Sequence, residues 1–233
     1  MGADSYKPPI GNVDLDGVFT IREYGDADAI RRYIIAGTRR AAVVGGGLLG
    51  LEAARHLRTP QLESLTIIEA LPRLLPRQLD EVGARLLQRI IERLPATVLL
   101  GTQVAEFLGG RRVEGLRLQD GRELAVQTVL ISAGIRPRIA LARDAGLVAN
   151  RGIVVDERLR SSDPDIFVAG DLVEYEGHIW GISLSSIGKV TLEPEARRAG
   201  GALRKIRPVP GGSIRLYPAG FQRESRLRQR PQR

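Results

Sequence analysis

The chain has 233 residues, 43% of them hydrophobic, and its formal net charge of +8 arises in the last 33 residues, where nine basic residues accompany one acidic residue. Because there is no cysteine and there are only two histidines, the sequence excludes disulfides, thiolate-bound metals and redox-active dithiols, and we expect no metal site. No apolar run is long enough to span a membrane and no secretory signal begins the chain, so we expect a soluble cytoplasmic protein of one large or two small domains, with no membrane partner.

The first 33 residues predict a short strand at Gly17–Ile21 and a short helix at Asp26–Tyr33. They are too few to enclose a hydrophobic core of their own. We therefore expect them to dock on another part of the chain.

Residues 39–70 predict a strand, a helix and a second strand, with Gly45-x-Gly47-x-x-Gly50 between the first strand and the helix. Gly45 permits a tight turn, Gly47 leaves room for a pyrophosphate, and Gly50 lets the helix pack closely on the sheet. This combination is typical of a dinucleotide-binding unit.

The phosphates of such a ligand are expected at the start of the helix, beside the backbone of Leu48 and Leu49. Unpaired N–H groups and the positive end of the helix dipole favour an anion there, whatever the side chains are.

Glu69 ends the second strand, about 20 residues beyond the last glycine of the motif. A carboxylate in that position can accept hydrogen bonds from the adenosine ribose, and it would repel a 2′-phosphate. We therefore expect NADH rather than NADPH. Arg73 and Arg77 leave the alternative open, because an arginine there could hold a 2′-phosphate.

The middle of the chain predicts an amphipathic helix followed by an antiparallel meander. Apolar residues of the helix, expected from Leu79 to Leu94, fall on one face: Val82, Leu86, Leu87, Ile90, Ile91 and Leu94. Strand-like runs follow at 97–100, 103–108, 113–118 and 124–132, and Asp120-Gly121 predicts a hairpin between the last two. The predicted fold class is α/β, with a Rossmann-like parallel sheet and an antiparallel β-meander crossover.

Two further short buried strands are predicted at 153–156 and 166–170, the second ending in Gly170-Asp171. Beyond Ser183 prolines and glycines interrupt every pattern, and the basic end of the chain has few apolar residues. We expect residues 183–233 to be partly disordered.

Four motifs in this order resemble the FAD-dependent pyridine nucleotide–disulphide oxidoreductase superfamily, over roughly residues 3–182. They are the segments 26–31, 45–54, 132–138 and 161–171. The nearest branch resembles the cysteine-free reductases, namely rubredoxin and ferredoxin reductases and the flavin part of NADH-dependent nitrite reductase.

The resemblance implies roles for several residues. The motif of Gly45, Gly47 and Gly50 would bind NAD(H), Glu52 would face the nicotinamide and flavin, and Asp171 with Gly170 would bind the ribityl chain of FAD. Gly134 would contact a cofactor at the domain crossover. Hydride would pass from nicotinamide to flavin, so that the protein's task is to hold two rings together.

Each of these residues also has a purely structural explanation. Gly170-Asp171 could be a strand-end turn, Glu52 could complement the helix dipole, and Gly134 could shape the crossover. Trp180, which lies where family members approach the flavin, could be a core residue.

The resemblance also implies a domain plan and an incomplete flavin site. Residues 1–33 would be a remnant of the FAD-binding domain, 34–139 the NAD(H)-binding domain, 140–182 the returning part of a partial FAD-type domain, and 183–233 a divergent basic segment. The N-terminal FAD-binding segment of the family is not matched, so we expect another polypeptide to supply it or the chain to lack it.

We therefore expect an NADH-dependent flavin oxidoreductase that passes electrons through FAD to a separate acceptor protein. A non-catalytic NAD(H)-binding fragment of such an enzyme is the alternative. A third hypothesis assigns the basic tail to nucleic acid, but few aromatic residues are available there for stacking, so nucleic acid is the least favoured partner.

Overall fold

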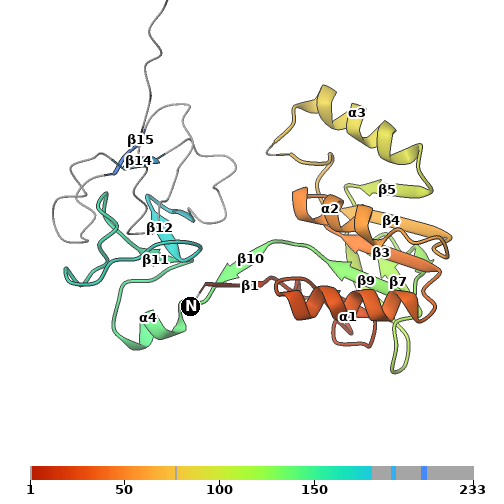
Figure 1. The fold of residues 1–233 in the computed structure, drawn as a ribbon, viewed down its shortest axis with the longest axis horizontal. Helices are drawn as coiled ribbons and strands as arrows, with labels where there is room; N and C mark the ends of the chain where they lie inside the picture. The colour runs from red at the N-terminus through yellow and green to blue at the C-terminus, as the bar shows by residue number, and fades with distance from the viewer. Residues whose placement is uncertain (1, 77, 180–189, 193–205, 209–233) are drawn as a thin grey trace, which may run out of the picture. The chain divides into compact units, whose positions relative to one another are not determined.

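The structure is a computed structural model that describes residues 2–76, 78–179, 190–192 and 206–208. The chain forms two compact units, residues 1–138 and 139–233 (Figure 1). Trp180 and, apart from 206–208, the basic tail lie outside the described residues. The assignment of residues 1–33 and 140–182 to a flavin-binding domain stays a prediction.

A five-stranded parallel sheet forms the centre of the first unit. Its strands, in spatial order, are β2 (Val18–Thr20), β9 (Thr128–Ile131), β3 (Arg40–Val44), β4 (Ser64–Glu69) and β5 (Ala96–Leu100). Every neighbouring pair runs parallel. The predicted Rossmann-like sheet is therefore confirmed.

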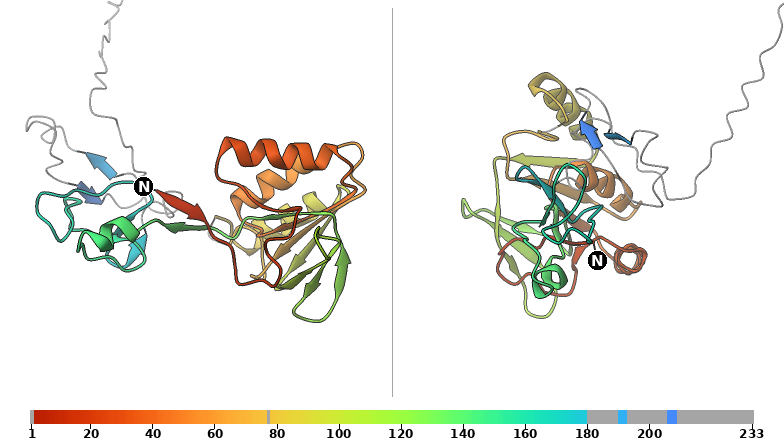
Figure 2. Two further views of the ribbon diagram at one scale, coloured as in Figure 1. Left: turned by 90° about the horizontal axis from the view of Figure 1, so that it is seen from below. Right: turned by 90° about the vertical axis from the view of Figure 1, so that its left-hand side faces the viewer.

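Helices cover one face of this sheet and a second sheet covers the other, as the left view of Figure 2 shows. The helices are α1 (Tyr24–Ile35), α2 (Leu48–Leu57) and α3 (Glu81–Glu92), and the second sheet is β6 (Val104–Leu108), β7 (Gly115–Leu118) and β8 (Glu123–Ala125). Side chains of a strand alternate between faces, so Ala41 and Val43 face the helices while Ala42 packs with Phe107 of the second sheet.

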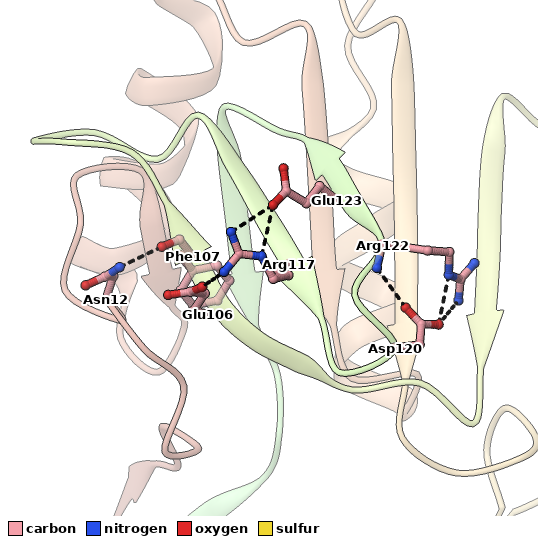
Figure 3. Close-up of polar contacts among 7 residues, drawn as sticks. All are labelled: Asn12, Glu106, Phe107, Arg117, Asp120, Arg122 and Glu123. Carbon is pink, nitrogen blue, oxygen red and sulfur yellow. Dashed lines mark hydrogen bonds and ion pairs between the residues drawn. The ribbon is translucent and has the colours of Figure 1, made fainter.

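The second sheet is the antiparallel meander that the hairpin signal predicts. Gly121 has a φ of +88°, which favours glycine in this turn. Arg117 on the central strand lies between Glu106 and Glu123 of its neighbours and forms ion pairs with both (Figure 3). These cross-strand pairs match the register of the strands.

The N-terminal residues dock on the rest of the first unit, as expected from their small number. Strand β1 (Ala3–Ser5) pairs with β10 (Ile135–Pro137), and β2 completes the edge of the parallel sheet. Asp4 and Arg138 form an ion pair beside this short ribbon. Ile10 is buried in the core between the two sheets.

The second unit is built from shorter elements. They are α4 (Ala140–Asp144), β11 (Ile153–Val154), β12 (Val173–Tyr175), β13 (His178–Ile179), β14 (Val190–Leu192) and β15 (Ile206–Pro208). Strands β11, β12 and β13 form one sheet and β14 and β15 another. A small core of Ala142, Ile153, Val155, Val168, Leu172 and Val173 lies within this unit.

Two strand predictions are wrong. The run 124–132 is two strands, because the chain crosses between the sheets at Val126–Gln127, where the Gln127 side chain accepts hydrogen bonds from the amides of Arg39 and Arg40. Residues 166–170 form no strand. Instead the backbone carbonyl of Asp163 accepts a hydrogen bond from the Ile166 amide in a turn. Only an isolated β-bridge joins Phe167 to Arg160.

Helix α3 begins two residues later and ends two residues earlier than predicted, and its apolar residues do not share one environment. Leu87 and Ile91 pack against the core, whereas Val82, Leu86, Ile90 and Leu94 are exposed. The longest helices among the described residues have 12 residues, and none is long and apolar enough to cross a membrane.

Candidate functional site

The turn between β3 and α2 contains Gly45, Gly46 and Gly47, and a fourth glycine, Gly50, lies in the first turn of α2. Gly45 donates a hydrogen bond to the carbonyl of Ile68 on the neighbouring strand and has a φ of +121°, a backbone conformation that side chains disfavour. The turn is therefore tied to the carboxyl end of the parallel sheet. This is the edge at which open α/β sheets bind ligands.

Three of these glycines have no room for a side chain. An added Cβ would lie 2.2 Å from the carbonyl oxygen of Ser132 at Gly45, 2.6 Å from Leu74 at Gly46, and 2.0 Å from the carbonyl oxygen of Gly45 at Gly50. Close packing of this turn against Ser132, Leu74 and the start of α2 explains these glycines without any ligand. It also brings Ser132, which begins the third family motif, against the first motif.

Gly47 differs from the other three. It is the N-cap residue of α2, its φ of −77° is open to any residue, and an added Cβ would meet no atom within 4 Å. Neither backbone conformation nor packing within the described part of the chain requires glycine at this position. The space that it leaves open lies directly before the first turn of α2.

The first turn of α2 presents backbone donors to that space. The first N–H groups of a helix have no intrahelical acceptor, and no side chain caps α2. No acidic residue lies in this turn, and the side chains of Leu48 and Leu49 are 56% and 63% exposed. The positive end of the helix dipole therefore faces the space before Gly47, and the first turn of α2 itself adds no negative side chain there.

Glu69 lies at the end of β4, next to the glycine turn, and is 9% exposed. Its Oε2 accepts a hydrogen bond of 2.6 Å from the Gly46 amide, and its Oε1 accepts one of 2.8 Å from the Leu71 amide. A carboxylate oxygen has two acceptor positions, so each oxygen can accept one more donor. The sequence does not reveal this contact with Gly46, which lies between the motif glycines.

Other candidate residues lie near the turn in sequence but make different contacts. Glu52 is exposed on α2, two residues beyond Gly50. Arg73 donates from its guanidinium to the carbonyl of Pro76, and its Nε is buried without a hydrogen-bond partner. Arg77 lies outside the described residues.

Gly134 lies two residues after Ser132, in the segment between β9 and β10. It has a φ of +103°, is exposed, and accepts a hydrogen bond of 2.9 Å from the Tyr6 amide through its carbonyl. The structure thus gives Gly134 a role in joining the N-terminal residues to the crossover. A cofactor contact stays a prediction.

Gly170 and Asp171 belong to the second unit, whereas the candidate residues described so far belong to the first. Gly170 has a φ of +84°, and its carbonyl accepts the Val173 amide in a turn that leads into β12. Asp171 is partly buried.

Close by in sequence, Glu174 is 5% exposed and accepts hydrogen bonds from Asn150, Arg151 and Gly152. Sequence reasoning missed Glu174, since nothing in a short strand marks its carboxylate as buried.

Desolvation is the largest influence on the carboxyl of Glu174 and raises its pKa. The hydrogen bonds from Gly152, Asn150 and Arg151 together outweigh desolvation, so the pKa of Glu174 lies below its ordinary value. The charged form of Glu174 is therefore favoured in the folded chain. Its hydrogen bonds attach the loop that precedes β11 to strand β12.

Residues 1–200 match the family described as pyridine nucleotide-disulphide oxidoreductase. The chain belongs to this family. The family expected from the four motifs is thus confirmed, and with it the assignment to the oxidoreductases.

Two curated members of the pyridine nucleotide-disulphide oxidoreductase family illustrate the relationship. The chain is 39% identical over 185 residues to the nitrite reductase [NAD(P)H] of Bacillus subtilis, covering 78% of this chain and 22% of the relative. It is 35% identical over 220 residues to the NADH oxidase of Methanocaldococcus jannaschii, covering 93% of this chain and 47% of the relative. The chain thus spans about a fifth to a half of these relatives.

A solved structure in the family supports the same fold. The FAD-dependent pyridine nucleotide-disulphide oxidoreductase from Desulfovibrio vulgaris superposes with a TM-score of 0.64 at 32% identity, covering 74% of this chain and 44% of that chain.

Proposed function

We propose that this chain binds NADH at the turn between β3 and α2 and acts in a flavin oxidoreductase. In that enzyme hydride passes from NADH to FAD, and electrons then pass to a separate acceptor protein. The nucleotide-binding residues of the proposal are Gly45, Gly47, Leu48, Leu49, Gly50 and Glu69.

Gly47 is the observation that carries the proposal. The fold explains Gly45, Gly46 and Gly50 by contacts shorter than a Cβ can make, but it leaves the position of a Cβ at Gly47 open. A pyrophosphate that approaches the bare backbone explains why a glycine stands there. The unpaired N–H groups at the start of α2 would bind its oxygens.

Glu69 supports NADH over NADPH. Its carboxylate is held beside the glycine turn by two backbone amides and keeps acceptor capacity for the ribose hydroxyls. A 2′-phosphate would meet this negative charge at close range. The names of the two curated relatives are consistent with a nicotinamide donor.

Further cofactor contacts are proposed for four residues: Gly170 and Asp171 at the ribityl chain of FAD, Gly134 at a cofactor near the crossover, and Glu52 facing the nicotinamide and flavin. Asp171 is partly buried and follows Gly170, whose φ is positive, in the turn that leads into β12. The exposed Glu52 projects from α2 close after the glycine motif and would orient the nicotinamide. Bound nicotinamide and flavin would supply the redox chemistry, while these residues bind and orient them.

A second candidate is NAD(H) binding without catalysis. It is favoured because the proposed NADH-binding residues, in the turn between β3 and α2 and at the end of β4, all belong to the first unit. Gly170 and Asp171, the proposed FAD-binding residues, belong to the second. In this case the chain binds NADH whether or not FAD is present.

Calorimetric titration with NADH tests the binding site. Gly47→Ala should fold as the wild type does but lower NADH affinity by about tenfold or more, because its methyl group occupies the phosphate position. Gly25→Ala is the matched control, since an added Cβ there also meets nothing within 4 Å, and it should bind NADH normally. Unchanged affinity in Gly47→Ala would contradict the proposal.

The visible absorption spectrum separates the two candidates. Protein supplied with FAD should show bound oxidised flavin that is bleached by NADH in the absence of oxygen. If NADH binds but the flavin is neither retained nor reduced, the non-catalytic candidate is correct.

A further inference from the structure

Helix α3 exposes a continuous apolar stripe that the fold does not use. Val82, Leu86, Ile90 and Leu94 are 65%, 53%, 49% and 42% exposed. Residues four apart in a helix lie almost above one another, each about 40° further round the axis, so Val82, Leu86 and Ile90 form one row about 12 Å long. Leu94 follows two residues after the end of the helix.

The packing of α3 is provided by a different row. Leu87 and Ile91 contact the core on the helical side of the parallel sheet, and Ala84 is buried. Leu87 lies about 100° round the helix axis from Leu86, and Ile91 lies about 100° from Ile90. An ordinary surface helix places its apolar stripe on the core and polar residues outside. In α3 a second apolar row faces outward beside the first.

A row of arginines borders the exposed stripe on its other side. Arg85, Arg89 and Arg93 are exposed and spaced four residues apart. Arg85 is paired with Glu81 at 3.4 Å, while Arg89 and Arg93 form no ion pair with the described residues. The outward surface of α3, which we call the α3 surface, therefore consists of the apolar stripe of Val82, Leu86, Ile90 and Leu94 and this arginine row.

This charge pattern disfavours a second copy of the chain as the occupant. If two copies pair these stripes about a two-fold axis perpendicular to the helix, the arginine row of one copy faces the same row of the other. Like charges at that spacing repel. A two-fold axis along the helix would bring each arginine row against the stripe of Leu87 and Ile91, which the protein's own core covers.

A lipid surface also fits less well than a protein. Helices that lie on anionic membranes carry basic residues across their polar face and often aromatic anchors on the apolar face. In α3 the polar face includes Glu81 and Glu92, and the exposed stripe is entirely aliphatic. The pattern fits an apolar centre with a charged rim on one side, as at protein interfaces.

We propose that the α3 surface is a docking site for a partner protein that presents an apolar ridge flanked by acidic side chains. The stripe would supply the desolvated centre, and Arg89 and Arg93 would select for the acidic rim and steer association. This inference is independent of nucleotide binding.

The test uses two designed amphipathic helical peptides of about 20 residues. Both carry leucines along one stripe, and one carries glutamates beside that stripe where the other carries lysines. The full chain should bind the glutamate peptide about tenfold or more tightly than the lysine peptide at low salt, and the preference should shrink at high salt.

Variants decide where the peptide binds, because the nine basic residues of 201–233 also attract acidic peptides. Leu86→Gln combined with Ile90→Gln should weaken binding of the glutamate peptide about tenfold. Arg89→Glu combined with Arg93→Glu should reverse the preference toward the lysine peptide. Ile35→Gln and Arg31→Glu, exposed on α1, are the matched controls and should change neither result.

The proposal is overturned if both α3 variants bind the two peptides as the wild type does. It is also overturned if the wild type forms a dimer that Leu86→Gln with Ile90→Gln dissolves, since the occupant is then a second copy. Binding to vesicles of phosphatidylcholine and phosphatidylserine that the same variant abolishes would assign the surface to lipid instead. Circular dichroism spectra of the variants should match the wild type, because all of the substituted positions are exposed.

Discussion

The carboxylate of Glu69 and the backbone amide of Gly46, 23 residues apart in the sequence, are joined by a hydrogen bond of 2.6 Å. The end of β4 is thereby tied to the turn that precedes α2. The residue expected to bind the ribose thus also fixes the loop expected to bind the phosphates. The two halves of the proposed nucleotide site are coupled through one side chain.

Glu69→Gln should destabilise the first unit by about 1–3 kcal/mol, because an amide NH2 replaces one of the two oxygens that accept backbone N–H groups. NADH affinity should fall as well, since the turn loses its anchor. Urea denaturation and NADH titration measure the two effects. Glu63→Gln, an exposed carboxylate just before the same strand, is the control and should leave NADH affinity unchanged.

Phe107→Ala should lower the free energy of unfolding by about 3–5 kcal/mol. Phe107 is fully buried between the parallel sheet and the antiparallel meander, so truncation leaves a cavity in that core. Chemical denaturation measures the loss. Leu86→Ala removes an exposed side chain of α3 and should cost far less. Equal losses in the two variants would contradict the assigned burial.

Glu174 should make the second unit sensitive to acid. Its pKa in the folded chain lies below the ordinary glutamate value of 4.5, so its stabilising effect is complete above that value and is lost as the pH falls through the lowered pKa. Hydrogen exchange at the Arg151 and Gly152 amides should therefore keep its protection at the pH at which an ordinary glutamate titrates and lose it only at lower pH.

The variant Glu174→Gln provides the check on this pH dependence. It should expose the Arg151 and Gly152 amides already at neutral pH and remove the acid-dependent change. Glu157→Gln, an exposed carboxylate of the same unit, should behave as the wild type. A wild-type exchange pattern in Glu174→Gln would show that the carboxylate does not hold the loop.

Glu52→Gln tests the proposed positioning of the nicotinamide. In protein supplied with FAD, the variant should bind NADH with nearly normal affinity but reduce the flavin about tenfold more slowly, because a group that orients the ring acts mainly on the reaction step. Stopped-flow absorption follows the reduction. Glu92→Gln, a carboxylate change on α3, should leave the rate unaltered. A wild-type rate in Glu52→Gln would support the alternative role of complementing the helix dipole.

Local patterns in the sequence predicted the elements of the first unit well. The glycine motif with its flanking strands, the hairpin at Asp120-Gly121 and the α1 helix are confirmed because each depends on contacts between near neighbours. The run 124–132 was harder. Apolar residues continue through it, and only the pairing partners on either side show that it passes from one sheet to another.

The strand predicted at 166–170 fails for a related reason. Its apolar residues suggest burial, yet Ile166 and Phe167 are 39% and 45% exposed. The Ile166 amide donates its hydrogen bond to the carbonyl of Asp163 in a turn and not to a neighbouring strand. Only Val168 of this run reaches the small core of the second unit. Burial depends on what packs against a segment, and composition alone does not specify it.

The sequence by itself determined the family, the parallel sheet and the positions of the turn glycines, because spacing and local conformational preference encode these features. The tertiary structure alone decided which glycines the packing requires, that Glu69 holds Gly46, and that one apolar row of α3 faces outward. These facts depend on distances between segments far apart in the chain. Such distances are set by the whole packed core, so no local pattern of residues contains them.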